Sequence, residues 1–178
     1  MMIGNRVRGA AWAAMLAALP AAGRLLGGAL GQGCGHPLAC RVAGLVLLAV
    51  VVRAAAVTGR YLAVYGKTGP GRGFGELDRL VTEGPYSCMR HPMHFFLAWL
   101  PLAVALLLAS PGAVLVALLE AALVLALAVT LDERESIARF GDEYLAYRRR
   151  VPAFNPSPHC LAKALGPRPP KHSREPRR

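Results

Sequence analysis

The chain has 178 residues, of which 54% are hydrophobic and 17% charged, and its mean hydropathy is +0.38. This composition excludes an intrinsically disordered chain and indicates insertion into a membrane. The formal net charge is +11, but the basic residues form no DNA- or RNA-binding motif. We interpret them as topology determinants and contacts for anionic lipid head groups, and we expect no nucleic-acid partner.

Four long apolar runs predict four transmembrane helices. They cover residues 9–30, about 39–64, 94–109 and 114–131. Spans of about 17–25 residues match a bilayer core of about 30 Å. The first run also resembles a cleaved signal peptide, because Arg6 and Arg8 precede it, but the three further spans favour a retained helix. Ser110-Pro111-Gly112 predicts the turn between the last two runs.

The distribution of basic residues predicts the orientation of these spans. Lys and Arg precede the first run, separate the second from the third and follow the fourth, whereas the turn around Pro111 carries no charge. Basic flanks remain in the cytoplasm. With four spans, both termini of this multi-pass chain are therefore expected to be cytoplasmic.

The remaining sequence indicates one membrane domain over residues 1–160, followed by a basic, proline-rich tail over 161–178. The glycine-rich stretch 69–75 predicts a loop, and the four prolines after Gly166 predict disorder. Apolar residues recur every three or four positions over residues 137–151, which predicts an amphipathic helix against the membrane or capping the domain. The expected fold class is all-α, a polytopic membrane protein with about four transmembrane helices plus a C-terminal amphipathic helix.

The cysteines and histidines give weaker signals. Cys34 and Cys40 are either a disulfide, if their side of the membrane is oxidising, or two separate thiols. No CxxC pair exists, and Cys88 and Cys160 fall on the predicted cytoplasmic side. His91 and the histidine three residues later have no cysteine or carboxylate partner at metal-site spacing, so we expect no metal.

One acidic residue stands alone inside the fourth apolar run. Glu120 is costly at that depth unless it is paired, which makes it a candidate functional residue. Arg53, in the second run, is its expected partner, since a long side chain can bridge their difference in depth. A structural ion pair that only fixes helix packing is the equal alternative.

A second group of polar and ring-bearing side chains is expected at the cytoplasmic membrane boundary. Tyr86, Arg90, His91 and His94 precede or open the third run, and Asp132-Glu133 ends the fourth. Such rings stack on adenine-like bases and attract a sulfonium cation, while carboxylates accept hydrogen bonds from ribose hydroxyls or an ammonium group. The alternatives are an arginine that reaches for head groups and a solvated helix end.

These segments resemble the isoprenylcysteine carboxyl methyltransferase and phospholipid methyltransferase family of integral membrane enzymes. The resemblance spans residues 66–156, whereas the N-terminal third matches only in being two membrane helices. The matching residues are Leu80-Val81-Thr82-Glu83-Gly84-Pro85-Tyr86, Arg90-His91-Pro92-Met93-His94, Asp132-Glu133, Phe140-Gly141-Asp142-Glu143-Tyr144, Tyr147, Val151-Pro152 and Pro156.

The resemblance implies S-adenosylmethionine as the cofactor, bound on the cytoplasmic side, with a lipid acceptor entering between helices. The implied cofactor-binding residues are Leu80, Val81, Tyr86, His91, Pro92, Met93, His94, Asp132 and Glu133. The candidate catalytic residues are Glu120, Arg90 and His94, and the candidate substrate contacts are Arg53 and Glu120.

Three residues depart from the family pattern, and because of them the fold and the cofactor carry over to this chain better than the identity of the substrate does. His94 stands where the family usually has tyrosine, and Asp132 replaces the first of two glutamates. Ala128 occupies the place of an arginine that lies near the substrate carboxylate in the eukaryotic isoprenylcysteine enzymes.

The resulting expectation is S-adenosylmethionine-dependent methyl transfer to a lipid-linked or apolar acceptor at the cytoplasmic interface of the bilayer. Carboxyl O-methylation of a prenylcysteine-like substrate is favoured by motif likeness. N-methylation of an ethanolamine-type phospholipid is the first alternative, and it needs a base, for which Glu120 or His94 is available. A non-enzymatic membrane adapter is the second alternative. NADPH-dependent sterol reductases share an Arg-His-Pro entry, but they are far longer chains, so this chain is not an obvious member of that class. The sequence leaves the oligomeric state open.

Overall fold

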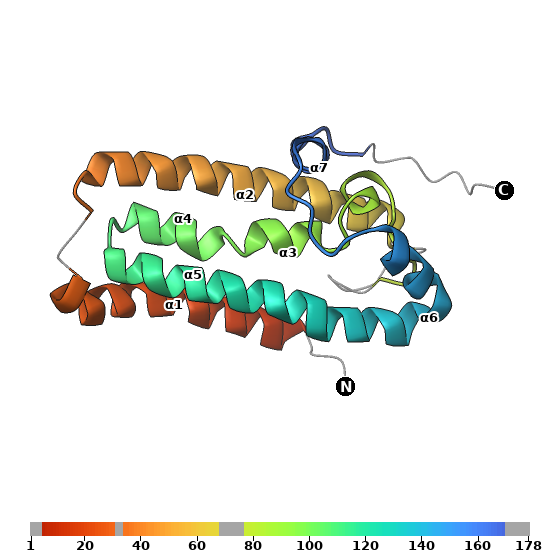
Figure 1. The fold of residues 1–178 in the computed structure, drawn as a ribbon, viewed down its shortest axis with the longest axis horizontal. Coiled ribbons are helices and arrows are strands. Elements are labelled where there is room, and N and C mark those ends of the chain that lie inside the picture. Colours follow the sequence, from red (N-terminus) through yellow and green to blue (C-terminus); the bar gives the residue numbers. More distant parts are fainter. Residues whose placement is uncertain (1–4, 31–33, 68–76, 170–178) are drawn as a thin grey trace. The chain divides into compact units, whose positions relative to one another are not determined.

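The computed structural model describes residues 5–30, 34–67 and 77–169, so the predicted loop 69–75 and the end of the predicted tail lie outside the described residues. The described part contains helices and no strand, which confirms the all-α prediction. In chain order the elements are α1 (Asn5–Leu30), α2 (Pro37–Tyr65), the 3₁₀ turn η1 (Gly84–Ser87), α3 (Pro92–Leu97), α4 (Leu100–Leu107), α5 (Pro111–Leu127), the π-helical turn η2 (Ala128–Asp132), α6 (Glu133–Arg150) and α7 (Pro158–Leu165) (Figure 1).

The chain divides into two compact units. The first unit comprises Met1–Val52 and Phe96–Leu127, and the second comprises Arg53–Phe95 and Ala128–Arg178. The long helix α2 and the continuous helix from α5 to α6 therefore each contribute to both units. The predicted boundary between residues 160 and 161 stays a prediction, and α7 runs across it.

The first unit is a helical bundle packed through small side chains. Helix α1 contacts α4 and α5, and Leu19 lies fully buried among Ala105, Ala113 and Ala117. On α2, a Cβ at Gly44 would lie 2.9 Å from the carbonyl oxygen of Ala103, so only glycine allows the two backbones to approach this closely. Small residues at helix contacts are typical of membrane bundles, because apolar side chains gain little by leaving lipid.

The third apolar run is two helices, which corrects the prediction of one continuous span over 94–109. Helix α3 ends at Leu97 and α4 begins at Leu100, with a turn at Ala98 and Trp99 between them. Pro101 in the first turn of α4 explains the break, because proline has no N–H to continue the hydrogen bonds of α3. The turn between α4 and α5 lies at Leu108 and Ala109, just before the predicted 110–112, because α5 already begins at Pro111.

Two described helical stretches are long and apolar enough to cross a membrane. They are Pro37–Tyr65 and the continuous stretch Pro111–Arg150; the shorter apolar stretches are Ala13–Gly23 and Pro92–Leu107. The count of four spans stays a prediction.

The second unit is organised around η1 and its two neighbours, α6 and α7. Gly84 opens η1 with φ +58°, and a Cβ there would lie 2.3 Å from the ring of Tyr61, so this position requires glycine. The amphipathic helix predicted over 137–151 is present within α6, but it is interrupted at Gly141, where φ is 54° and ψ is −129°. Beyond the interruption, Tyr144 and Tyr147 are buried.

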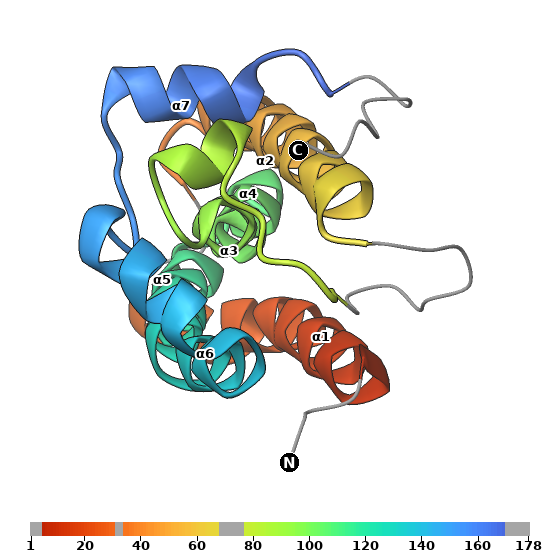
Figure 2. The ribbon, with the colours of Figure 1, turned by 90° about the vertical axis from the view of Figure 1, so that its right-hand side faces the viewer.

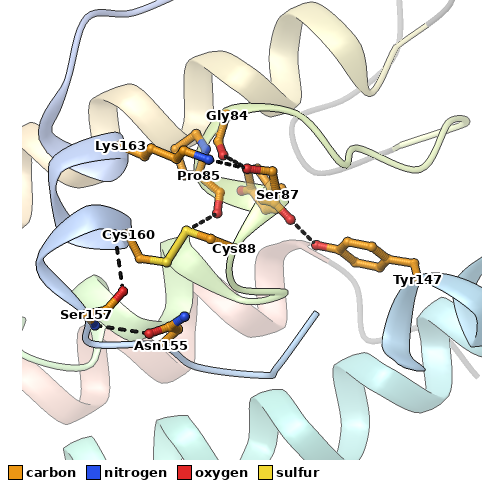
Figure 3. The surroundings of a disulfide bond; sticks show 10 residues. Gly84, Pro85, Ser87, Cys88, Tyr147, Asn155, Ser157, Cys160 and Lys163 are labelled. Carbon is orange, nitrogen blue, oxygen red and sulfur yellow. Dashed lines mark hydrogen bonds between the residues drawn. A yellow bond between two sulfur atoms is a disulfide. The ribbon is translucent and has the colours of Figure 1, made fainter. Parts of the chain in front are cut away.

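Helix α7 lies against η1 in the second unit (Figure 2). Cys88, just after η1, forms a disulfide with Cys160 of α7, and Lys163 donates a hydrogen bond to Ser87 at 2.8 Å (Figure 3). Cys34 and Cys40 form the other disulfide, which agrees with one of the two alternatives expected from the sequence. The contact between α7 and η1 was not predicted, because no local pattern links residues as far apart as Ser87 and Lys163.

Candidate functional site

The site begins where the chain enters α3. Pro92 is buried at the first position of α3, and the two residues before it lie outside any helix. The backbone N–H of Arg90 donates to the carbonyl of Pro152 at 2.9 Å, and that of His91 donates to Ala153 at 3.2 Å. This short pairing attaches the segment that follows α6 to the Arg-His-Pro entry.

The guanidinium of Arg90 is surrounded by acceptors. Its Nε donates to Oε1 of Glu133 at 3.0 Å, and its Nη2 contacts the same oxygen. Its Nη1 donates to the carbonyls of Arg148, at 3.2 Å, and Val151. Each guanidinium nitrogen therefore has a protein partner, and Arg90 joins the start of α6 to its end.

Glu133 is the buried anion of the site. Its side chain is 4% exposed, and Arg148 contacts the second carboxylate oxygen, with Nε 3.2 Å from Oε2. Nε2 of His91 lies 3.4 Å from Oε1 but forms no aligned hydrogen bond with it. The π-helical turn η2 directly precedes Glu133, and such turns are frequent at functional sites.

His91 is a buried, neutral ring. Burial lowers the pKa of its imidazole to about 4, and the nearby ring of His94 acts in the same direction. The ring centroid of Phe154 lies 6.1 Å from that of His91, and Phe154 lies equally far from Phe95. His91 is therefore held between aromatic rings and cannot readily carry a proton at neutral pH.

His94 and Asp132 form a second, more accessible pair. Nε2 of His94 lies 3.1 Å from Oδ2 of Asp132, and the side chains are 30% and 22% exposed. The ring centroids of His91 and His94 are 6.0 Å apart. The two carboxylates predicted from the sequence thus have different environments, because Glu133 is buried among cations and Asp132 faces an accessible imidazole.

Three tyrosines line the same unit. The hydroxyl of Tyr147 donates to the backbone carbonyl of Tyr86 at 2.6 Å. The hydroxyls of Tyr86 and Tyr144 are buried and form no hydrogen bond of good geometry in the described part of the chain, although that of Tyr144 lies beside Arg90 and Ser136. Burial raises the pKa of the Tyr86 phenol, so this group is a neutral donor at any physiological pH.

These hydroxyls and Nε2 of His91 are three buried polar atoms without a hydrogen-bond partner among the described residues. A buried polar atom without a partner is uncommon in native proteins and calls for an explanation. Two phenols and an imidazole are groups that can hydrogen-bond to the hydroxyl, amino and carboxylate groups of S-adenosylmethionine. The chemistry of the second unit therefore fits this cofactor.

The other residues predicted for the site lie in different surroundings. Val81 is buried and Leu80 and Met93 are half-buried in the second unit. Arg53 donates to the carbonyls of Leu165 and Gly166 at the end of α7, at 3.1 and 2.5 Å.

Glu120 belongs to the first unit, on α5. Its Oε2 is buried without a hydrogen-bond partner in the described part of the chain. Its expected pairing with Arg53 and its catalytic role stay predictions.

Sequence reasoning missed several residues that complete the site. Arg148 was interpreted only as a topology determinant, and Phe154 was not considered. Tyr144 was included in the motif but given no role. Its spacing from Tyr147 was a usable signal, because two tyrosines three residues apart share a helix face.

Comparison with known families agrees with this geometry. A family model described as phospholipid methyltransferase matches residues 37–141, which is more than half of the chain. The chain belongs to this family. The match includes the Arg-His-Pro entry, His94, Asp132 and Glu133, and it confirms the resemblance found in the sequence. Comparisons with curated proteins and with solved structures return no match.

Family membership and the two long apolar helices identify a membrane protein of a methyltransferase family. The matched region ends at Gly141, so the second half of α6 and α7 lie beyond it. In this chain the second half of α6 nevertheless supplies Tyr144, Tyr147 and Arg148 to the surroundings of Arg90 and Glu133.

Proposed function

We propose that the protein transfers a methyl group from S-adenosylmethionine to a lipid-linked or apolar acceptor at the cytoplasmic interface of the membrane. The observation that carries the proposal is the presence of three buried polar atoms without a hydrogen-bond partner, Tyr86 Oη, Tyr144 Oη and His91 Nε2, in the same unit as the Arg90–Glu133 pair. Family membership supports the methyl-transfer chemistry. When bound, the cofactor supplies an electrophilic methyl group on a positively charged sulfur.

The side chains of the second unit have distinct roles in this proposal. The two tyrosine hydroxyls would donate hydrogen bonds to the polar groups of the cofactor. Arg90 would hold Glu133 and the end of α6 in place, since its guanidinium nitrogens are engaged by protein oxygens. Methyl transfer by in-line displacement depends mainly on such positioning of the two reactants.

Two acceptors are consistent with this chemistry. A prenylcysteine-like carboxylate is supported by the motif likeness. Its main difficulty is Ala128, which stands where the eukaryotic isoprenylcysteine enzymes have an arginine near the substrate carboxylate. The amine of an ethanolamine-type phospholipid is supported by the accessible His94–Asp132 pair, which offers a base. It is also supported by Arg53 and Arg90, because both are already bound to protein oxygens and not placed to receive a carboxylate.

The proposed topology has several membrane spans with both termini in the cytoplasm, where S-adenosylmethionine is available. The basic residues on the predicted cytoplasmic segments support this orientation. A cysteine-labelling experiment on a variant with a single cysteine added near either terminus would test it.

The catalytic proposal is tested with detergent-purified protein and S-adenosylmethionine labelled in its methyl group. Mixed micelles containing phosphatidylethanolamine and micelles containing an N-acetylated prenylcysteine serve as the two acceptor probes. Label in either lipid fraction supports the proposal. A folded protein that transfers no label and binds no S-adenosylmethionine would contradict it, and binding to anionic vesicles alone would favour the membrane adapter.

A further inference from the structure

The disulfide between Cys88 and Cys160 joins two parts of the second unit that are 72 residues apart in the sequence (Figure 3). Its two Cα atoms are 5.9 Å apart, a separation at which disulfides commonly form. Both cysteines fall on the predicted cytoplasmic side of the membrane. Because cytosolic thiols are kept reduced, disulfides there are rare and are usually transient, catalytic or redox-sensing. The pairing and its location together indicate a bond that opens and closes.

The two cysteines differ in their exposure to solvent. Cys88 is half-buried, whereas Cys160 is 1% exposed, so a small thiol from solution reaches Cys88 first. Cys160 lies in the first turn of α7, where backbone N–H groups favour a negative charge, so its thiolate is a suitable leaving group. The reduced form also has a hydrogen-bond acceptor in place, because Sγ of Cys88 lies 3.6 Å from the carbonyl oxygen of Pro85.

Apart from the disulfide, α7 has a small hold on its surroundings in the described part of the chain. The buried residues of α7 are Cys160 and Ala164, and both side chains are small. Lys163 donates a hydrogen bond to Ser87 of η1, but this bond is exposed. Two further exposed hydrogen bonds run from Arg53 of α2 to carbonyls at the end of α7. A helix with so little buried apolar surface opens locally at low cost once its covalent tie is broken.

The disulfide also fixes the chain that carries residues of the candidate site. Cys88 lies two residues after Tyr86 and two residues before Arg90. The carbonyl of Tyr86 accepts a hydrogen bond from Tyr147 at 2.6 Å, and the guanidinium of Arg90 binds Glu133. This segment is thus attached to both α6 and α7. Loss of the attachment to α7 leaves the segment held by α6 and the chain that follows it.

We propose that the Cys88–Cys160 disulfide is a reversible redox switch that attaches α7 to η1 when oxidised and releases it when reduced. Release of α7 loosens the segment from Tyr86 to Arg90 and thereby weakens binding of the methyl donor. The exchange rests on the proposed cytoplasmic location of the second unit, and the effect on the methyl donor rests on the proposed function.

The exchange partner is a small monothiol of the glutathione class. Its thiolate attacks Sγ of Cys88 and forms a mixed disulfide, while the electron pair of the broken S–S bond leaves on Cys160, which takes up a proton. A second monothiolate attacks the outer sulfur of the mixed disulfide, and Cys88 leaves as a thiolate and is protonated. The two cysteines are thus reduced, and the two monothiols that supplied the protons are oxidised to one disulfide. Reoxidation by that disulfide follows the same steps in reverse.

The redox state is measured on the full chain carrying Cys34→Ser and Cys40→Ser, which leaves the Cys88–Cys160 pair alone. Detergent-purified protein is equilibrated in glutathione buffers from oxidised to reduced, quenched with acid and labelled with a mass-tagged maleimide. We expect both cysteines to take up label in a buffer of cytosolic composition, and the disulfide to re-form in the oxidised buffer. A pair that stays oxidised in the cytosolic buffer would identify a permanent structural disulfide and overturn the switch. Peptide mapping of the wild type gives the same readout without the two serine substitutions.

Release of α7 has a readout of its own. The chain contains three lysines, Lys67, Lys163 and Lys171, so a lysine-specific endoprotease cuts α7 at one position. Cleavage after Lys163 requires opening of the helix, and cleavage after Lys67 is the internal reference. Reduction should raise the ratio of the two cleavage rates by about 30-fold or more, the lower end of what removing a disulfide does to an opening equilibrium. Cys88→Ser should give the high ratio in either buffer. An equal ratio in oxidised and reduced protein would refute the release.

Calorimetry with S-adenosylhomocysteine on the oxidised and reduced protein measures the effect on the candidate site. Reduction should weaken binding about fivefold or more, the lower end of typical couplings between two sites. Cys88→Ser should bind as the reduced protein does in both buffers. Equal, measurable affinities in the two forms would reject control of the site while the proposed function stands. If neither form binds, the proposed function fails, and labelling and proteolysis still decide whether the disulfide opens and releases α7.

Discussion

The Arg90–Glu133 pair should be the main energetic link within the second unit. Arg90 and Glu133 are 9% and 4% exposed, and Nε lies 3.0 Å from Oε1. Removing one member of a buried pair costs about 3–5 kcal/mol, because an uncompensated charge remains. In Arg90→Met, Arg148 still contacts Oε2 of Glu133 but is itself half exposed. We therefore expect a loss near the lower end, about 3 kcal/mol of unfolding free energy.

A double-mutant cycle measures this link directly. Glu133→Leu should also cost about 3 kcal/mol, because Arg90 then keeps only the carbonyls of Arg148 and Val151. The double variant Arg90→Met/Glu133→Leu contains neither buried charge, so its loss should fall about 3 kcal/mol short of the sum of the single losses.

The assay is reversible unfolding in mixed micelles of a mild detergent and dodecyl sulfate. Arg149→Met is the matched control, because Arg149 is an exposed arginine in the last turn of α6, next to Arg148, and it should change stability by less than about 0.5 kcal/mol. Additive single losses, within about 0.5 kcal/mol, would refute the reasoning that these two side chains form one buried unit.

Three further predictions concern the same unit. Gly84→Ala should destabilise the protein by about 2 kcal/mol or more in the same unfolding assay, because its Cβ would overlap the ring of Tyr61. Gly141 also has a positive φ, but a Cβ there would meet no atom within 4 Å, so Gly141→Ala should cost only about 1 kcal/mol. Tyr147→Phe should lower the free energy of unfolding by about 1 kcal/mol, because it removes the hydrogen bond to the Tyr86 carbonyl. An unchanged stability would contradict that hydrogen bond. The pKa of His91 is about 4 in the folded chain and near 6.5 when unfolded. Its contribution should therefore make stability fall as the pH drops from about 6.5 to about 4, and leave stability above pH 7 unchanged. His91→Phe, measured in parallel with wild type, should remove that part of the pH profile.

Local signals in the sequence were sufficient for much of the fold. Apolar runs predicted α1, α2 and α5, and Ser110-Pro111-Gly112 predicted the turn before α5, because each of these signals acts within a few residues. The break between α3 and α4 was also readable in principle, since Pro101 lies within the third run. It was missed because length and hydropathy alone were used to define that span.

The pairing of distant residues was less accessible from the sequence. The approach of Arg90 to Glu133 was not stated in advance, although both residues were assigned to the site. It depends on the π-helical turn η2 and on the segment after α6 returning to the Arg-His-Pro entry. The interruption of α6 at Gly141, which precedes that return, was hidden by an apolar spacing that continues through it.

Calorimetric titration of S-adenosylmethionine into purified wild type, Tyr86→Phe and Tyr147→Phe tests the central claim most directly. We predict saturable binding by the wild type. Tyr86→Phe, which removes a buried hydroxyl without a protein partner among the described residues, should weaken binding about five- to tenfold, or about 1–1.4 kcal/mol, and leave stability unchanged. Tyr147→Phe should lower stability and affect binding less. Absence of saturable binding by folded wild type, in detergent and in lipid bilayer discs alike, would contradict the claim that this unit holds the methyl donor.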